Sequence, residues 1–168
     1  MYAVGSKVVH PSHGAGTIIS IQQKRIGDRS RKYYIIDPVA KSMRLMVPVK
    51  RAEHGRLRHV GQEANLREVL ATLRIAPPED ERWPDHRARQ RITREKLKTG
   101  RFTEVASVVR TLYLLSSQRR LGMTDRQALD DGKDFLAGEL ALASGLELPG
   151  AMTEIEDSLA QMLVVEEE

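Results

Sequence analysis

A single tryptophan stands directly before the most cationic stretch of this chain. Trp83 is the only tryptophan among 168 residues. Six arginines and lysines follow it within 15 positions, namely Arg87, Arg89, Arg91, Arg94, Lys96 and Lys98. Such cations neutralise phosphates, and an apolar ring beside them can wedge between base pairs from the minor groove. The sequence leaves open whether Trp83 is an exposed wedge of this kind or an anchor in the core.

Patterns for catalysis or metal binding are weak by comparison. The sequence has no Gly-x-Ser-x-Gly, no Walker loop and no His-Glu-x-x-His, and its carboxylates fall mostly on predicted solvent faces or in the C-terminal tail. His10 and His13 could approach one point, but two imidazoles fall short of the three or four ligands of a zinc site. We therefore expect a non-enzymatic protein without metal or cofactor, in which these loop histidines hydrogen-bond the backbone.

Charge is distributed unevenly, although the net charge is only +4. Arginine and lysine dominate residues 1–62 and 82–101, whereas aspartate and glutamate dominate residues 63–81 and 102–168. This segregation predicts two basic surfaces and an acidic C-terminal end, so a polyanion or an acidic protein is the expected partner. A merely solvated charged face remains the alternative.

Length and composition limit the class of protein. A chain of 168 residues allows one domain or two small ones, and 40% hydrophobic residues suffice to bury a core. The absence of cysteine excludes disulfides, Fe–S clusters and thiol catalysis, and it fits a reducing compartment. No uncharged apolar run approaches the ~18 residues of a membrane span, and no signal-peptide core is present. We therefore expect a cytoplasmic protein.

Residues 4–60 have the short period of β-strands. Four runs rich in β-branched and aromatic residues, separated by Gly- and Pro-containing turns, predict four or five antiparallel strands. The runs are residues 7–10, 17–21, 32–36 and 43–49. Because so small a sheet buries little surface when flat, we predict a bent half-barrel of the SH3 or Tudor type. Gly14 and Gly16 are expected to permit positive φ and tight curvature between strands.

After Gly61 the period becomes helical, so we place a boundary there between domains of residues 1–60 and 61–168. About five helices are predicted, and the fold class is therefore α+β, a small antiparallel half-barrel followed by an all-α domain. The cationic helix is expected to run from Pro84 to Thr99, with Gly100 as its left-handed stop. Capping-box patterns at Thr124 and Thr153 predict the starts of the last two helices.

Four motifs resemble the CarD/CdnL family of bacterial transcription regulators. Residues 4–16 are similar to the family pattern V-G-D-x-V-V-Y-P-x-H-G-x-G, and residues 46–49 to the end of a family strand. Residues 95–112 and 136–143 resemble its helical E-K-L-x-S-G…V-A-E-V-V-R-D-L and L-x-x-E-L-A-L-A stretches. The motifs occur in the family's order over nearly the whole chain.

The resemblance implies a Tudor-like N-terminal domain that docks on the β subunit of bacterial RNA polymerase, and a helical C-terminal domain that contacts promoter DNA. In the family, a tryptophan wedges into the minor groove at the upstream edge of the melted region and stabilises the open complex. Trp83 stands three residues earlier than the family's tryptophan, and His86 occupies the family position.

The residues that would carry these contacts form two sets. The expected polymerase-binding residues are Lys24, Arg25, Arg44 and Met46, and the expected DNA-binding residues are Trp83, His86, Arg87, Arg89, Arg91 and Arg94. The resemblance also implies a cytoplasmic, nucleoid-associated protein, with neither a membrane nor a small-molecule substrate as partner. Two alternatives stay open: a KOW/Tudor-like module that recognises RNA or a ribosomal partner and oligomerises through its helices, and a stand-alone relative of the polymerase-interacting domain of transcription-repair coupling factors.

Overall fold

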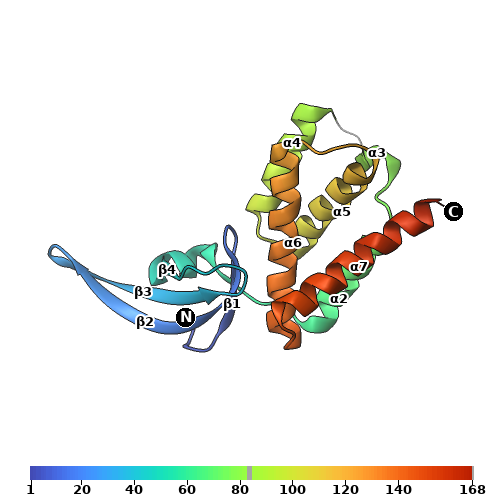
Figure 1. Ribbon diagram of the computed structural model, residues 1–168. Coiled ribbons are helices and arrows are strands. Elements are labelled where there is room, and N and C mark those ends of the chain that lie inside the picture. Colours follow the sequence, from blue (N-terminus) through green and yellow to red (C-terminus); the bar gives the residue numbers. More distant parts are fainter. Residues whose placement is uncertain (83–84, 168) are drawn as a thin grey trace.

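The computed structural model has an antiparallel sheet in its first third and a group of helices in the remainder (Figure 1). It describes residues 1–82 and 85–167, so Trp83 and the predicted helix start at Pro84 lie outside the described residues. The predicted α+β class is confirmed. Within the described part of the chain, no helix combines the length and the apolar character needed to cross a membrane.

Five strands form one sheet in the order β4-β3-β2-β1-β5. They are β1 (Lys7–His10), β2 (Gly14–Ile26), β3 (Arg29–Pro38), β4 (Leu45–Pro48) and β5 (Arg58–His59). The register of β2 against β3 shifts between Ile18 and Ser20, which is the kind of irregularity that bends a strand. Since β4 and β5 lie at opposite edges, the sheet is curved but not closed, as expected of a half-barrel.

Two glycines allow this curvature for different reasons. Gly14, at the start of β2, has φ +80°, so the expectation of a positive φ is confirmed there. Gly16 does not have a positive φ. A Cβ at Gly16 would lie 2.7 Å from Cγ2 of Ile36 and 2.8 Å from the carbonyl oxygen of Asp37. Position 16 therefore needs glycine because β3 passes too close for a side chain.

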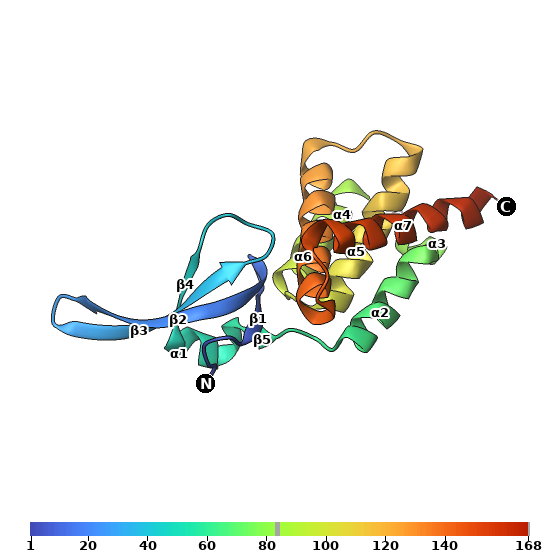
Figure 2. The same ribbon diagram turned by 60° about the horizontal axis from the view of Figure 1, so that its bottom comes forward.

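Strands β2 and β3 form a longer hairpin than the sequence predicts. Their pairing extends from Gly16 and Pro38 to Ile26 and Arg29. Residues 22–32, which we call the distal hairpin, are all exposed, and they extend away from the rest of the molecule (Figures 1 and 2). These residues have no buried face, so they lack the alternation that identifies a strand in sequence.

The sheet has its own apolar core. Val8, Ile18, Tyr34 and Ile36 are each no more than 1% exposed, and Tyr2 packs against this cluster, with its backbone N–H donating to the hydroxyl of Tyr34. Helix α1 (Val49–Arg51) and one turn of π-helix (Ala52–Arg56) follow β4, and Val49 and Ala52 join the core. The predicted strand over residues 43–49 therefore ends at Pro48.

The described helical part contains five longer helices, in agreement with the expected number, and short turns between them. They are α2 (Glu63–Ala71), α4 (His86–Lys98), α5 (Phe102–Gln118), α6 (Met123–Ser144) and α7 (Leu148–Glu167), together with a 3-10 turn (Thr72–Arg74) and the short α3 (Glu79–Arg82). Helix α6 is central, because α5 and α7 pack on it and its C-terminal half meets β2. Figure 2 shows the sheet beside this group of helices.

The predicted end of α4 agrees with the structure, whereas the predicted starts of α6 and α7 do not. Gly100 has φ +64° at the end of α4, which confirms the expected left-handed stop, and Gly145 ends α6 in the same conformation with φ +77°. Both predicted capping boxes are wrong. Helix α6 begins at Met123 with Gly122 as N-cap, and α7 begins at Leu148, so Thr153 lies inside the helix and its Oγ1 donates to the carbonyl of Pro149.

Candidate nucleic-acid interface

Helix α4 is fixed locally at both ends. Asp85 is its N-cap, and Oδ1 of Asp85 accepts a hydrogen bond from the backbone N–H of Ala88 at 3.0 Å. At the other end, a Cβ on Gly100 would lie 2.8 Å from Cα of Pro11, which belongs to the loop between β1 and β2. The C-terminal end of α4 therefore abuts the sheet.

Helix α4 presents exposed cations on one side. These are Arg87, Arg91, Arg94 and Lys98, which we call the α4 cationic face. Their spacings of four, three and four residues place them along a single stripe, and Ala88, Ile92 and Leu97, which lie outside this stripe, are half-buried. At 1.5 Å per residue the stripe is about 16 Å long. Phosphates along one DNA strand are spaced about 3.4 Å along the axis, so the stripe can follow several of them.

Arg89 does not belong to this face, which corrects the sequence-based set. It is 6% exposed, and its Nη2 donates to Oδ2 of Asp125 on α6 at 3.0 Å. A guanidinium buried between two helices and held by a carboxylate cannot reach a phosphate at the surface. Arg89 instead attaches α4 to α6.

His86 lies in the first turn of α4 and is exposed. Nη2 of Arg89, which already donates to Asp125, also lies 2.9 Å from Nδ1 of His86. A guanidinium can only donate, so Nδ1 of His86 is the acceptor of this hydrogen bond. This contact orients the imidazole ring. Trp83, the expected wedge, lies outside the described residues.

The expected polymerase-binding residues lie on one part of the sheet but do not form one contact. Nζ of Lys24 in β2 lies 3.6 Å from Sδ of Met46 in the edge strand β4, and Met46 is 43% exposed. Arg25 is next to Lys24 in the strand and therefore points to the opposite face, and Arg44 precedes β4. The structure thus brings Lys24 and Met46 together, and it leaves Arg25 and Arg44 as exposed neighbours.

The distal hairpin carries a strong positive charge. Its exposed cations are Lys24, Arg25, Arg29, Arg31 and Lys32, against one carboxylate, that of Asp28. Because the hairpin projects from the molecule, these charges act far from the acidic residues of the helices (Figure 1). Three of them, Arg29, Arg31 and Lys32, were not among the predicted site residues.

A buried carboxylate joins the sheet to the helices. Glu139 on α6 is fully buried, and it accepts hydrogen bonds from Nη1 and Nη2 of Arg58 at 2.7 and 2.6 Å and from the N–H of Gly61 at 2.8 Å. Arg58 in β5 also donates from Nε and Nη2 to the carbonyl of Gly100, at 3.1 and 2.9 Å. This group, which we call the Glu139 cluster, connects the sheet edge, α6 and the end of α4.

Sequence reasoning missed several of these residues. Lys98 could have been added to the stripe from its position four residues after Arg94. Arg58 and Glu139 gave no local signal, because they are 81 residues apart and meet only in the folded chain.

The two loop histidines pack together near the junction of sheet and helices. Their ring centroids are 4.8 Å apart, and Nδ1 of His10 accepts the N–H of Ser12, which confirms the expected backbone hydrogen bond for His10. Nδ1 of His13 instead accepts from Nζ of Lys41 at 3.2 Å. Burial, and then the nearby charges of His13, Arg56 and Lys41, lower the pKa of His10 to about 4. In residues 1–82 and 85–167, no three His, Asp or Glu side chains are placed to share a metal ion.

Comparison with known proteins covers both parts of the chain. Residues 2–61 match the family described as "CarD-like/TRCF RID domain", and residues 68–156 match the family described as "CarD, C-terminal domain". The chain is also 29% identical over 146 residues to a Bacillus subtilis (strain 168) protein named "Putative transcription factor YdeB", an alignment that spans 87% of this chain and 94% of that protein. The two family matches occur in the order sheet then helices, and we conclude that this chain belongs to the CarD family.

Proposed function

We propose that this chain regulates transcription by joining RNA polymerase to promoter DNA. In this proposal residues 1–60 form a domain that docks on the polymerase β subunit, and residues 61–168 form a domain that binds DNA. Membership of the CarD family and the likeness to a protein named as a transcription factor support regulation of transcription over catalysis. The observation that carries the DNA-binding part is the α4 cationic face.

The polymerase side of the proposal depends on the edge strand β4. An edge strand exposes main-chain N–H and C=O groups that can pair with a strand of a partner. Met46 would supply an apolar contact at that edge, and Lys24, Arg25 and Arg44 would favour an acidic partner surface. The match of residues 2–61 to the CarD-like/TRCF RID domain supports this partner.

The DNA side of the proposal assigns phosphate contacts to Arg87, Arg91 and Arg94, with Lys98 added and Arg89 removed. The oriented His86 and Arg87 lie at the start of α4, three and four residues after Trp83 in the sequence. Trp83 is proposed as the minor-groove wedge at the upstream edge of the melted region, where unstacking one base step would stabilise the open complex. This role comes from the family resemblance.

Binding of the full-length chain to a forked promoter fragment at several KCl concentrations tests the DNA contacts. Each lost phosphate contact lowers the log–log slope of affinity against salt by about 0.9. We expect Arg91→Gln to lower the slope by this amount. Lys32→Gln, which removes a cation of the distal hairpin, is the matched control and leaves the slope unchanged. Equal slopes for Arg91→Gln and the parent chain would refute the α4 interface.

Capture of the polymerase β subunit by the full-length chain, without nucleic acid, tests the docking surface. Met46→Glu places a carboxylate on the edge strand and is expected to weaken capture, whereas Arg91→Gln leaves it unchanged. Capture that is unaffected by Met46→Glu, or that requires RNA, would contradict docking through β4.

A further inference from the structure

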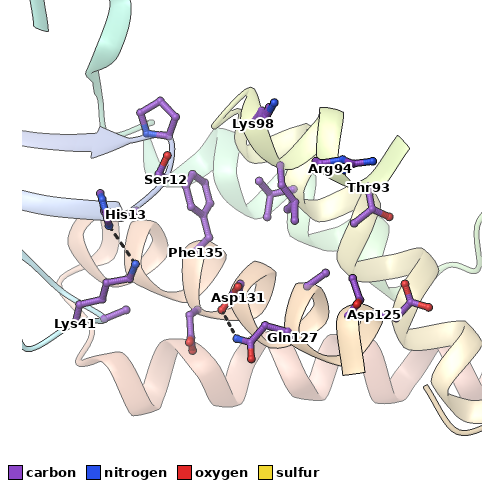
Figure 3. Close-up of a pocket in the computed structure, with 18 of the residues that line it drawn as sticks. Ser12, His13, Lys41, Thr93, Arg94, Lys98, Asp125, Gln127, Asp131 and Phe135 are labelled. Carbon is purple, nitrogen blue, oxygen red and sulfur yellow. Dashed lines mark hydrogen bonds between the residues drawn. The ribbon is translucent and has the colours of Figure 1, made fainter. Parts of the chain in front are cut away.

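A cavity of about 740 Å³ lies where the sheet meets the helices. Its walls are mainly α4 and α6, with residues 11–15 at the turn into β2, residues 40–41 and Val105 of α5 completing the lining (Figure 3). Sites for small ligands commonly have volumes of ~300–1,000 Å³, so the cavity can hold one. The proposed function assigns no role to it.

The two long walls of the cavity differ in charge. Helix α4 contributes Arg94 and Lys98, which are cationic, whereas α6 contributes Gln127, Asp131 and Asp134. Figure 3 shows the α4 side chains on one side and the Gln127–Asp131 pair on the other. A ligand that fits both walls therefore has an anionic group at one end and hydrogen-bond donors at the other.

An aromatic ring stands between these walls. Phe135 projects from α6 toward α4 (Figure 3). It lines the cavity together with Leu97 of α4, and both side chains are only partly buried. A Cβ on Gly14 would lie 3.8 Å from Cδ2 of Phe135, so the ring is held against the sheet loop on one side. The middle of the cavity is thus suited to a planar, apolar group.

The carboxylates that line the cavity differ in whether they are free to accept a hydrogen bond from a ligand. Asp125 is already paired with the buried Arg89. Oδ1 of Asp131 accepts a hydrogen bond from Nε2 of Gln127 at 2.8 Å, which orients that carboxylate. Burial and the neighbouring Asp131 and Asp130 raise the pKa of Asp134, against the opposing effect of Lys41 and Lys133. Asp131 is therefore the oriented acceptor that a ligand would meet on the α6 wall.

We propose that this cavity binds one nucleotide, with its base against Phe135, its phosphate at Arg94 and Lys98, and the donors of the base at Asp131. Aromatic side chains stack on bases, and a carboxylate accepts well from an amino group on a base edge. Guanine offers two adjacent donors, N1–H and N2–H, to such a carboxylate. Thymine has no amino group. The cavity should therefore prefer guanine to thymine.

Two sources could supply this nucleotide, a free mononucleotide or an unpaired residue of a melted DNA strand. Arg94 and Lys98 belong both to the cavity wall and to the α4 cationic face, so a single strand that follows α4 passes the cavity. The inference goes beyond the proposed function, because the cavity can bind a nucleotide whether or not α4 contacts duplex DNA.

Titration of the full-length chain with three probes tests the proposal. The probes are guanosine or thymidine monophosphate, a short single-stranded oligonucleotide that contains guanine or thymine at one position, and a blunt duplex. Loss of a stacked base contact weakens binding by about fivefold or more, and we expect this for Phe135→Leu with the nucleotide that binds. Tyr33→Leu, on the sheet, is the aromatic control and leaves nucleotide binding unchanged.

The variants separate this proposal from the duplex interface. Arg87→Gln, which lies outside the cavity lining, should weaken duplex binding and leave nucleotide binding intact, whereas Phe135→Leu should do the reverse. Asp131→Asn replaces an exposed carboxylate, so it tests the proposal even if Phe135→Leu does not fold, and it should abolish the preference for guanine over thymine.

Saturable binding of guanosine monophosphate would identify a free nucleotide as the source, and binding of the guanine oligonucleotide alone would identify the single strand. Either result supports the proposal when Asp131→Asn removes the guanine preference. No binding of either probe, or a guanine preference that survives Asp131→Asn, would overturn it. Duplex binding by the parent chain in the same series reports on the α4 interface separately.

Discussion

Replacing Glu139 with glutamine should loosen the connection between the sheet and the helices. The carboxylate is fully buried and accepts three hydrogen bonds, two from Arg58 and one from the N–H of Gly61. In Glu139→Gln one acceptor oxygen becomes an NH₂ group, so at least one of these donors loses its partner. The guanidinium of Arg58 also loses the charge that offsets its desolvation.

The size of the effect follows from the exposure of the two partners. Breaking a fully buried ion pair costs about 3–5 kcal/mol of folding free energy. The side chain of Arg58 is 35% exposed, so water can solvate part of the guanidinium after the change. We therefore expect a loss of about 2–3 kcal/mol, below the fully buried range. For a chain of this length, that loss lowers Tm by about 4–12 °C.

Calorimetric melting of the full-length chain measures this loss. Glu154→Gln is the matched control, because Glu154 pairs with Arg67 at 2.7 Å but both side chains are 42% exposed. An exposed pair of this kind contributes about 0–1 kcal/mol. Equal melting temperatures for Glu139→Gln and Glu154→Gln would refute the view that the Glu139 cluster holds the two parts together.

Three further variants probe other contacts of the fold. Asp125→Asn leaves the buried Arg89 without its counter-charge, so chemical denaturation should show a loss of about 3 kcal/mol in the free energy of unfolding. DNA affinity should fall while the log–log slope of affinity against salt stays the same. A changed slope would make Arg89 a phosphate contact. In Gly100→Ala the alanine must adopt φ +64° and place its Cβ 2.8 Å from Cα of Pro11. The substitution should therefore destabilise the chain by about 1 kcal/mol or more. An unchanged Tm would contradict the close approach of the Gly100 and Pro11 backbones. The folded pKa of His10 is about 4 and its ordinary value is 6.5, so between these pH values the unfolded chain holds a proton that folded His10 does not. Stability should therefore fall as pH is lowered through this window, and His10→Gln should reduce the difference in Tm between pH 7 and pH 5; an unchanged difference would show that other groups cause it.

Helix α4 illustrates how far sequence reasoning reaches. Gly100 as its stop is a local signal and behaves as predicted, whereas the N-cap Asp85 was not predicted. The helical period alone would have separated Arg89 from Arg87, Arg91 and Arg94, although the sequence-based set grouped the four together. It places Arg89 on the side of Ile92, which is half-buried. What the period does not supply is Asp125, 36 residues away, without which a buried guanidinium would be too costly.

The errors elsewhere have similar physical causes. The capping-box pattern at Thr153 lies inside α7, because an apolar contact can extend a helix beyond a local start signal. Ala151, two residues before Thr153, is fully buried in the helical core. The distal hairpin was missed because none of its side chains is buried. With every side chain exposed, its β-structure is maintained by main-chain pairing, which leaves no hydrophobic pattern in the sequence.

Contacts at both ends hold α4 in place, and this affects how strongly its cations would bind a polyanion. Near its N-terminus Arg89 joins it to Asp125 on α6, and at its C-terminus the carbonyl of Gly100 accepts from Arg58 while the backbone of Gly100 abuts Pro11. The helix therefore does not need to be ordered or reoriented when a polyanion binds to it. Because ordering costs are subtracted from binding free energy, a pre-positioned stripe of cations retains more of its phosphate contacts as affinity. The contacts of Gly100 with Arg58 and Pro11 also connect α4 to β5 and to the β1–β2 loop. A partner bound to the sheet would therefore hold the α4 cationic face in one fixed direction.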